Sequence, residues 1–201
     1  MKKIALALIT TAGALGALSS AHAEDWNTSN LKPYIGASVV GSQHKYNLGN
    51  DTSGGDNKST EYGGKIYGGV QLDKTWGVEL GYTDFGKSSY GYAVNGVNGN
   101  IDSHAKSWYL AGKATWPVNE QFNVFGKLGV ARNKNDVNAT GLATIYNSGD
   151  SNKTGLYASV GGEYVINQKV SAVLEYEHYG KNDIDQGRRN GAISLGAKFN
   201  F

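Results

Sequence analysis

The sequence predicts an all-β protein: an eight-stranded antiparallel up-and-down transmembrane β-barrel, preceded by a cleaved signal peptide. First, apolar and polar residues alternate in eight segments, each of about the 9–11 residues that a tilted strand needs to cross a bilayer. Second, the connections between these segments alternate between long and short. Third, no stretch after residue 23 is apolar for long enough to cross a bilayer as a helix. Such a chain can span a membrane only as a closed barrel, because open strand edges are not stable in hydrocarbon.

Residues 1–23 have the features of a secretory signal peptide. Lys2 and Lys3 are followed by an apolar run from Ile4 to Leu18 and by the cleavage pattern Ala21-His22-Ala23. A first transmembrane helix is the weaker interpretation, because the run is short and rich in Ala, Gly and Thr. We therefore expect cleavage after residue 23 and a single barrel domain over residues 24–201.

Charge and cysteine content exclude several classes of function. Cleavage would remove two of the 19 basic residues and make their number equal to the 17 acidic ones, so the pI of 8.6 does not indicate a nucleic-acid partner. The absence of cysteine excludes a disulfide scaffold, a thiolate zinc site and a cysteine nucleophile. The histidines lack the spacing of metal ligands, and we expect no cofactor.

Each expected strand has an apolar set and a polar set, because residues two apart share a face. In order, the strands cover residues 32–46, 65–72, 77–85, 104–116, 121–131, 153–166, 169–179 and 191–201. Their apolar sets are Ile35, Ala37 and Val39; Ile66, Val70 and Leu72; Val78, Leu80 and Tyr82; Trp108, Leu110, Ala114 and Trp116; Phe122, Val124, Leu128 and Val130; Leu156, Ala158, Val160 and Tyr164; Val170, Ala172, Leu174 and Tyr176; and Ile193, Leu195, Ala197, Phe199 and Phe201. These sets contain almost no charge, as a lipid-facing surface requires.

The connections favour a membrane barrel over a soluble sandwich. The short turns are residues 73–76, 117–120 and 167–168, and the long loops are residues 47–60, 87–103, 132–152 and a last loop through Arg188-Arg189. In a soluble sandwich, nothing requires the short loops to lie at one end of the strands and the long loops at the other. Outer-membrane barrels do have this arrangement, with short periplasmic turns and long outer loops. We expect both termini on the periplasmic side.

Aromatic residues lie near the expected strand ends, as amphipathic rings at a membrane interface do. The interface set near the short turns is Trp76, Trp116, Phe122 and Tyr164, and the set nearer the other end is Tyr82, Trp108 and Tyr176. Aromatic residues are also common at strand ends of other β-proteins, and that interpretation stays open.

Several short segments resemble, in strand order, the transmembrane domain of the OmpA-like outer-membrane barrels of Gram-negative bacteria. They are Tyr34-Ile-Gly-Ala37 with Ser42-Gln43, Tyr67-Gly-Gly-Val-Gln71, Gly77-Val-Glu-Leu-Gly-Tyr82, Ala111-Gly-Lys113, Trp116-Pro117, Lys127-Leu-Gly129, Gly161-Gly-Glu-Tyr164, Leu174-Glu-Tyr176 and Ser194-Leu-Gly196. The resemblance implies an integral protein of the cell outer membrane with a structural, membrane-integrity role. It also implies a monomer in contact with outer-membrane lipid and lipopolysaccharide. Phe199 and Phe201 resemble the signal that the barrel-assembly machinery accepts after periplasmic chaperones. Because the sequence stops at Phe201, we expect no peptidoglycan-binding domain.

The polar faces bring eight charged residues to the expected interior: Lys65, Glu79, Lys113, Lys127, Glu163, Glu175, Glu177 and Lys198. Buried charges are stable only when they are paired, and Glu79 is expected to pair with Lys113 or Lys127. An eight-stranded barrel is just wide enough to be filled by side chains, which favours a plugged, structural interior over a narrow, low-conductance pore. The resemblance implies that Glu79 and Lys113 occupy gate positions, although Val173 replaces the family's Arg partner.

Two other classes of function stay open. A lipid A-modifying enzyme would need a nucleophile beside a base, and the candidates are Ser42 with His44, His104 with Ser103 or Ser107, and His178. No orienting acid stands out, and we expect no catalytic residues. The long outer loops could instead bind a ligand or act as an adhesin. Lys87 and Arg188-Arg189 are candidates to meet lipopolysaccharide phosphates.

Overall fold

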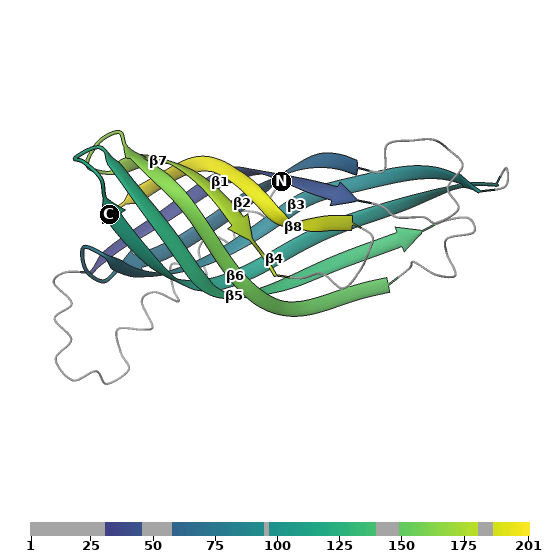
Figure 1. Cartoon of the computed structure of the whole chain (residues 1–201), viewed down its shortest axis with the longest axis horizontal. Coiled ribbons are helices and arrows are strands. Elements are labelled where there is room, and N and C mark those ends of the chain that lie inside the picture. The colour runs from purple at the N-terminus through teal and green to yellow at the C-terminus, as the bar shows by residue number, and fades with distance from the viewer. Residues whose placement is uncertain (1–30, 46–57, 95–96, 140–148, 181–186) are drawn as a thin grey trace, which may run out of the picture. The chain divides into compact units, whose positions relative to one another are not determined.

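The computed structural model describes residues 31–45, 58–94, 97–139, 149–180 and 187–201. The strands are β1 (Lys32–Lys45), β2 (Lys58–Gln71), β3 (Trp76–Val94), β4 (Val97–Pro117), β5 (Phe122–Ala139), β6 (Gly149–Val165), β7 (Val170–His178) and β8 (Gly187–Asn200). Each strand pairs antiparallel with the next, and β8 pairs with β1 to close the barrel (Figure 1). The predicted eight-stranded antiparallel barrel is therefore confirmed. The predicted signal peptide, residues 1–23, lies outside the described residues.

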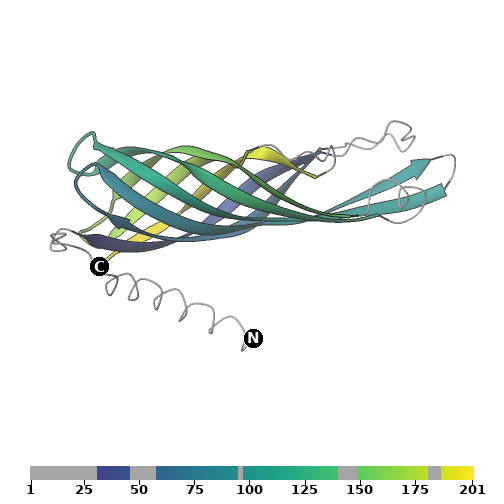
Figure 2. The same cartoon turned by 90° about the horizontal axis from the view of Figure 1, so that it is seen from below.

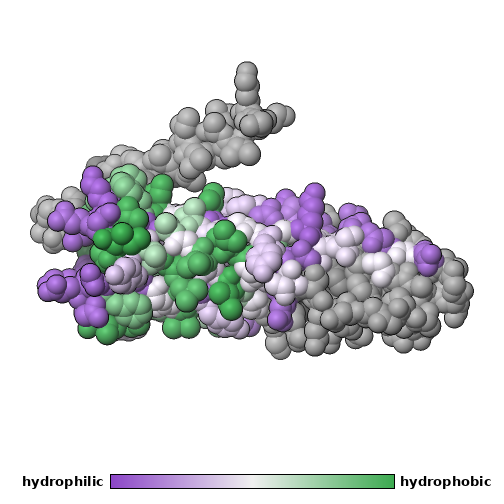
Figure 3. All heavy atoms as spheres, turned by 90° about the horizontal axis from the view of Figure 1, so that it is seen from above, coloured by the Kyte–Doolittle hydropathy of each residue, from purple (hydrophilic) through white to green (hydrophobic). Residues whose placement is uncertain are grey.

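The barrel is hydrophobic outside and charged inside. Along β7, Glu175 and Glu177 are 2% and 0% exposed, whereas Leu174 and Tyr176 are 55% and 53% exposed. The same alternation recurs on the other strands, because successive side chains of a strand point to opposite faces. Figure 3 shows the hydrophobic residues gathered in a band on the barrel surface, with hydrophilic residues beyond it. No helix among the described residues is long and apolar enough to cross a membrane.

Three four-residue turns of one design join the strands at one end of the barrel. Asp73, Asn119 and Asn167 each accept hydrogen bonds from the backbone N–H groups two and three residues later. In each turn the residue before the Asp or Asn also donates its backbone N–H to the first residue of the next strand. An Asp or Asn side chain stabilises a tight turn in this way. The third turn, residues 166–169, is thus longer than the two residues predicted and matches the other two.

Strands extend further at the opposite end than the sequence pattern predicts. Much of the predicted loops 87–103 and 132–152 is strand in β3, β4, β5 and β6, so those loop boundaries were wrong. Figure 2 shows β3 and β4 continuing as a pair beyond the region where all eight strands lie side by side. Polar cross-strand bonds support this extension: Ser89 donates to Asp102, 2.6 Å away, and Asn100 donates to Ser89 at 2.9 Å. Here the backbone ladder continues through segments rich in Ser, Gly and Asn, in which the apolar alternation that indicates a strand is weak.

β2 and β3 separate at a bulge in β3. Their ladder runs from the Gln71–Gly77 pair to the Gly64–Asp84 pair, whereas β3 and β4 remain paired up to Val94 and Val97. Gly86 lies in this bulge with a φ of 81°, a conformation that glycine adopts without strain. The bulge therefore marks the level at which the common barrel wall ends between these two strands.

Candidate functional site in the barrel lumen

The eight charged residues predicted for the interior all lie there, and each is buried. They come from seven strands: Lys65 (β2), Glu79 (β3), Lys113 (β4), Lys127 (β5), Glu163 (β6), Glu175 and Glu177 (β7), and Lys198 (β8). Successive side chains of a strand point to opposite faces, so each of these residues shares the inner face with the residues two positions away. Residues that are far apart in the sequence thus meet along the barrel axis.

Five of these residues form a continuous chain of alternating charge. The Lys127 ammonium lies 2.6 Å from Glu79 and 2.7 Å from Glu175. The Lys65 ammonium lies 2.8 Å from both Glu175 and Glu177. Each lysine therefore joins two carboxylates, and the chain crosses the lumen from β3 to β7.

The other three residues form a second cluster around Glu163. Lys198 lies 2.5 Å and Lys113 3.8 Å from the Glu163 carboxylate. The Lys113 ammonium also lies over the rings of Phe125 and Tyr34, at 4.5 and 5.1 Å from their centroids. Of the two partners expected for Glu79, Lys127 is thus the one in contact, and Lys113 is directed to Glu163.

Tyrosine hydroxyls complete the hydrogen bonding of the carboxylates. Tyr34 and Tyr109 donate to Glu79 at 2.9 and 2.6 Å, and Tyr157 and Tyr179 donate to Glu177 at 2.8 and 2.6 Å. The sequence analysis did not assign these tyrosines to the site. Tyr34, Tyr109 and Tyr157 lie on the polar faces of their strands, and this alternation is the feature of the sequence that places them in the lumen.

A layer of aromatic rings lies next to the charged chain, toward the extended end of the barrel. The Tyr109 and Tyr157 rings are stacked with centroids 4.2 Å apart, and Tyr179 packs edge-on against Phe85 at 5.0 Å and meets Tyr157 at 5.2 Å. All four side chains are fully buried. The rings come from β3, β4, β6 and the residue after β7, so they enter the lumen from several sides.

Comparison with known proteins identifies the family. The family described as "Outer membrane protein beta-barrel domain" matches residues 10–201. The chain belongs to this family. Its membership, together with the relatives below, makes the protein an OmpA-like barrel of the outer membrane.

Relatives of this OmpA-like barrel are themselves outer membrane proteins. Outer membrane protein A of Shigella flexneri is 28% identical over 100% of this chain and 56% of the relative. Outer membrane protein A of Klebsiella pneumoniae is 25% identical over 84% of this chain and 50% of the relative. The chain thus spans about half the length of the curated relatives it matches.

Solved structures share the fold of the OmpA-like barrel. The crystal structure of Ail, the attachment invasion locus protein of Yersinia pestis, matches with a TM-score of 0.54 and 20% identity, over 86% of this chain and 99% of Ail. The crystal structure of OprG from Pseudomonas aeruginosa also has a TM-score of 0.54, at 16% identity, over 86% of this chain and 96% of OprG. At these identities the likeness establishes the fold alone.

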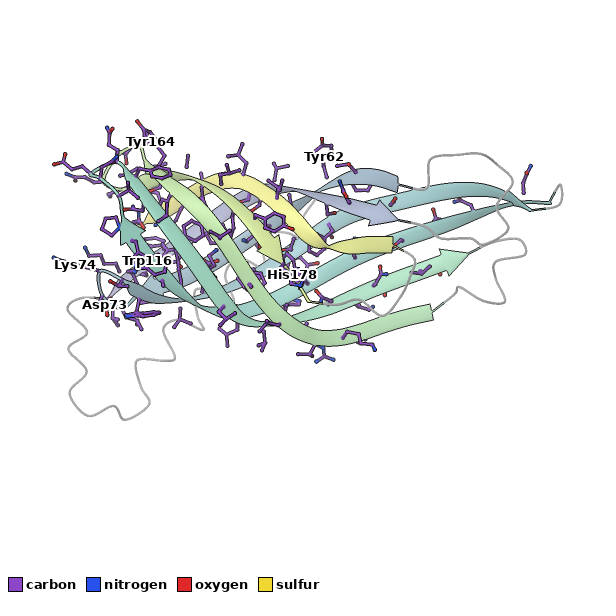
Figure 4. All side chains as sticks on the ribbon, in the orientation of Figure 1. Tyr62, Asp73, Lys74, Trp116, Tyr164 and His178 are labelled. Carbon is purple, nitrogen blue, oxygen red and sulfur yellow. The ribbon has the colours of Figure 1, made fainter. Side chains whose placement is uncertain are left out.

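Among the described side chains, His104 is not brought together with Ser103 or Ser107. Ser103 and Ser107 are buried on the inner face, and Ser103 donates to Asn135. His104 lies on the outer face, where its Nε2 is 3.0 Å from Asp84. Ser42 is also buried inside, and nothing is described of the His44 side chain. His178 alternates with the inward Glu177 and Tyr179, and Figure 4 shows its place near the end of β7.

The aromatic residues predicted for the interfaces lie on the outer face. Trp76, Trp108, Trp116, Phe122, Tyr164 and Tyr176 are exposed, and Tyr82 is half-buried. In Figure 4, Trp116 and Tyr164 lie at the same end of the barrel as Asp73 and Lys74 of the first short turn. Toward the other end, the Tyr82 and Trp108 rings are in contact, with centroids 4.6 Å apart. Their depth in a membrane stays a prediction.

Proposed function

We propose that this protein has a structural role in the outer membrane, with a lumen that is closed at rest by its own side chains. The observation that carries the proposal is the position of Lys127, which contacts both Glu79 and Glu175 inside the barrel. These contacts join strands on different sides of the lumen. The proposal makes the barrel a membrane anchor and excludes a permanently open pore.

The energetics of buried charge support a closed lumen. Separating one member of a buried ion pair from its partner costs about 3–5 kcal/mol, because the remaining charge is left without compensation. An open path along the axis would require Lys127 or Lys65 to leave two carboxylates each. If the carboxylates moved instead, Glu79 and Glu177 would lose their tyrosine hydrogen bonds. A narrow pore would therefore be a rare state.

Single-channel recording in planar lipid bilayers tests this proposal. We expect the refolded protein to show no sustained conductance, whereas Lys127→Met should open brief conducting states because two carboxylates lose their bridge. Lys74→Met, a change of the same kind in an exposed turn, is the matched control. Steady conductance from the unaltered protein would reject the closed lumen.

A second candidate function is binding by the strand extension beyond the apolar band. The observation that favours it is the continuation of β3 and β4 as a paired hairpin above the bulge at Gly86. Ail of Yersinia pestis has been crystallised in complex with the heparin analogue sucrose octasulfate, so immobilised heparin is a suitable probe. Replacement of residues 89–102 by Asn-Gly should abolish binding while the barrel stays folded. Equal retention of both forms on heparin would exclude this role for the hairpin.

The proposal includes no catalytic role, because the serine and histidine candidates of β4 lie on opposite faces of their strand.

We also propose that the protein is a monomer and that the barrel-assembly machinery inserts it into the membrane with the help of periplasmic chaperones. Phe199 and Phe201 are exposed with ring centroids 5.4 Å apart, which suits recognition during assembly. Slower membrane insertion of Phe201→Ala, measured against Phe122→Ala, would support that part of the proposal.

A further inference from the structure

A groove of about 440 Å³ lies on the outer face of β3, β4 and β5, in the apolar band and close to the short turns. The outward residues that line it are Trp76, Gly112, Ala114, Trp116, Gly126 and Leu128. We name it the outer groove. Its shape follows from the register, in which Trp76 lies opposite Ala114 and Ala114 lies opposite Gly126. Two small residues thus form a floor beside a large ring.

The barrel itself does not require glycine at the two glycine positions of this floor. A Cβ added at Gly112 would lie 3.9 Å from its nearest neighbour, the Leu128 carbonyl, and one at Gly126 would lie 3.7 Å from the Ser159 carbonyl. Both are ordinary van der Waals distances, whereas a Cβ at the inward Gly129 would collide with backbone atoms of β4. Glycine weakens a strand because it has no side chain to pack. Gly112 and Gly126 therefore keep a space open that larger residues could fill.

The outer membrane surrounds this groove with acyl chains. Apolar surfaces gain no hydrophobic stabilisation from meeting in hydrocarbon, so a chain is held only where it packs more closely than elsewhere. In the outer groove a chain would contact the floor and the side chains on both sides. On the adjoining wall, where Leu80 and Leu110 are exposed, it would contact one side only. From Gly112 to Trp116 the groove follows four residues of strand, a rise of about 13 Å.

Oppositely charged side chains lie in the turns next to the outer groove. The backbone N–H of Thr115 donates to the Thr75 carbonyl at 2.7 Å, so the first short turn packs against the strand that enters the second. These turns carry Lys74 and Glu120, both exposed, and Figure 4 shows Lys74 at the same end of the barrel as Trp116. Tryptophan at this end suits headgroup depth. A cation and a carboxylate there complement a headgroup that carries both charges.

We propose that the outer groove binds one acyl chain of a phospholipid whose headgroup carries a phosphate and a primary ammonium. Lys74 pairs with the phosphate, and Glu120 accepts a hydrogen bond from the ammonium. A choline headgroup has the same charges but no N–H donor, so it lacks the second contact. The inference rests on the outer-membrane location of the barrel and not on whether its lumen conducts.

Native mass spectrometry of the refolded protein tests the inference, with one equivalent of phosphatidylethanolamine added to the detergent. We expect one lipid to remain bound to the unaltered protein. Gly112→Val combined with Gly126→Val fills the outer groove and should weaken binding about tenfold, because the chain loses its packing contacts. The control combines Gly41→Val and Gly68→Val, two other outward glycines at which an added Cβ would lie 3.8 and 3.6 Å from its nearest neighbour. The control should bind as the unaltered protein does.

Two further comparisons separate the chain from the headgroup. Phosphatidylcholine with the same acyl chains should bind the unaltered protein about tenfold more weakly, and Lys74→Gln with Glu120→Gln should abolish this preference. Gly112→Ala with Gly126→Ala should bind with intermediate affinity, and it serves as the test if the valine variant does not refold. Equal binding by the groove variants and the control, or equal binding of the two lipids by the unaltered protein, would overturn the inference. Bilayer conductance does not enter this test, so the closed lumen and the lipid site can fail separately.

Discussion

The Lys127 ammonium lies 2.6 Å from a carboxylate oxygen of Glu79, although the two residues are 48 positions apart in the sequence. Both side chains are fully buried, so water cannot compensate either charge if the other is removed. The contribution of this buried ion pair to the free energy of unfolding can therefore be measured directly.

Lys127→Met should lower the free energy of unfolding by about 3–5 kcal/mol, because it leaves Glu79 and Glu175 without their shared cation. Urea unfolding of the barrel in lipid vesicles measures this. Adding Glu79→Gln should recover part of the loss, since one buried charge then disappears. Lys169→Met, in an exposed turn, should have almost no effect; equal destabilisation by both lysine variants would contradict the assignment.

Tyr109→Phe should destabilise the barrel by about 1.5–3 kcal/mol, the range for a hydrogen bond to a charged group. The hydroxyl that is lost donates to Glu79 at 2.6 Å, while the ring and its stacking on Tyr157 remain. Tyr176→Phe removes the same hydroxyl from an exposed outer side chain and is the control. The same vesicle unfolding assay compares them, and equal unfolding midpoints would show that the hydroxyl contributes nothing.

Leu128→Arg should cost about 2–4 kcal/mol if this side chain faces the middle of the bilayer. Leu128 is 62% exposed on the outer face of β5. Asn138→Arg introduces the same side chain at an exposed position of the β5 extension, where we expect almost no change. Unfolding titrations in vesicles check both variants. Comparable effects would mean that the apolar band does not contact lipid.

The first short turn should show a dependence on acid pH. Hydrogen bonds from the backbone N–H groups of Trp76 and Thr75 hold the pKa of the Asp73 carboxyl below its ordinary value of 3.8. A lowered pKa means that the carboxylate stabilises the turn above pH 3.8 and that this contribution is lost as the pH falls through the folded-state pKa. Asp73→Asn should remove this dependence and keep the turn, as Asn119 and Asn167 do. Amide hydrogen exchange at Trp76 between pH 5 and 2, expressed relative to intrinsic rates, measures it; identical profiles would contradict the prediction.

The sequence alone was sufficient for the membrane-spanning part of the fold. Alternation assigned Leu174 and Tyr176 to the outside and Glu175 and Glu177 to the inside, and the structure agrees. It succeeded because the bilayer imposes one strong rule on each outward residue. Above the apolar band that rule no longer applies, so segments rich in Ser, Gly and Asn in β3 and β4 were read as loop.

The contents of the site were predicted better than its pairing. Alternation along a strand identifies which side chains point inward. The partner of Glu79 depends in addition on the offset in register between neighbouring strands and on side-chain length. These bring Lys127 of β5 to Glu79 of β3, across the intervening strand β4. Alternation in the expected strand 169–179 places Tyr179 on the same face as Glu177, but it does not give their hydrogen bond, which forms just beyond the end of β7.

The three four-residue turns lie at one end of the barrel. Their length decides which side chains of the following strand face lipid and which face the lumen. One added residue within residues 118–121 would shift the following strand by a single position and exchange its two faces. Lys127 would then point into the acyl chains and Leu128 into the ionic lumen. A change of length is therefore expected to be tolerated better where a longer connection, such as residues 46–57 or 140–148, can absorb it.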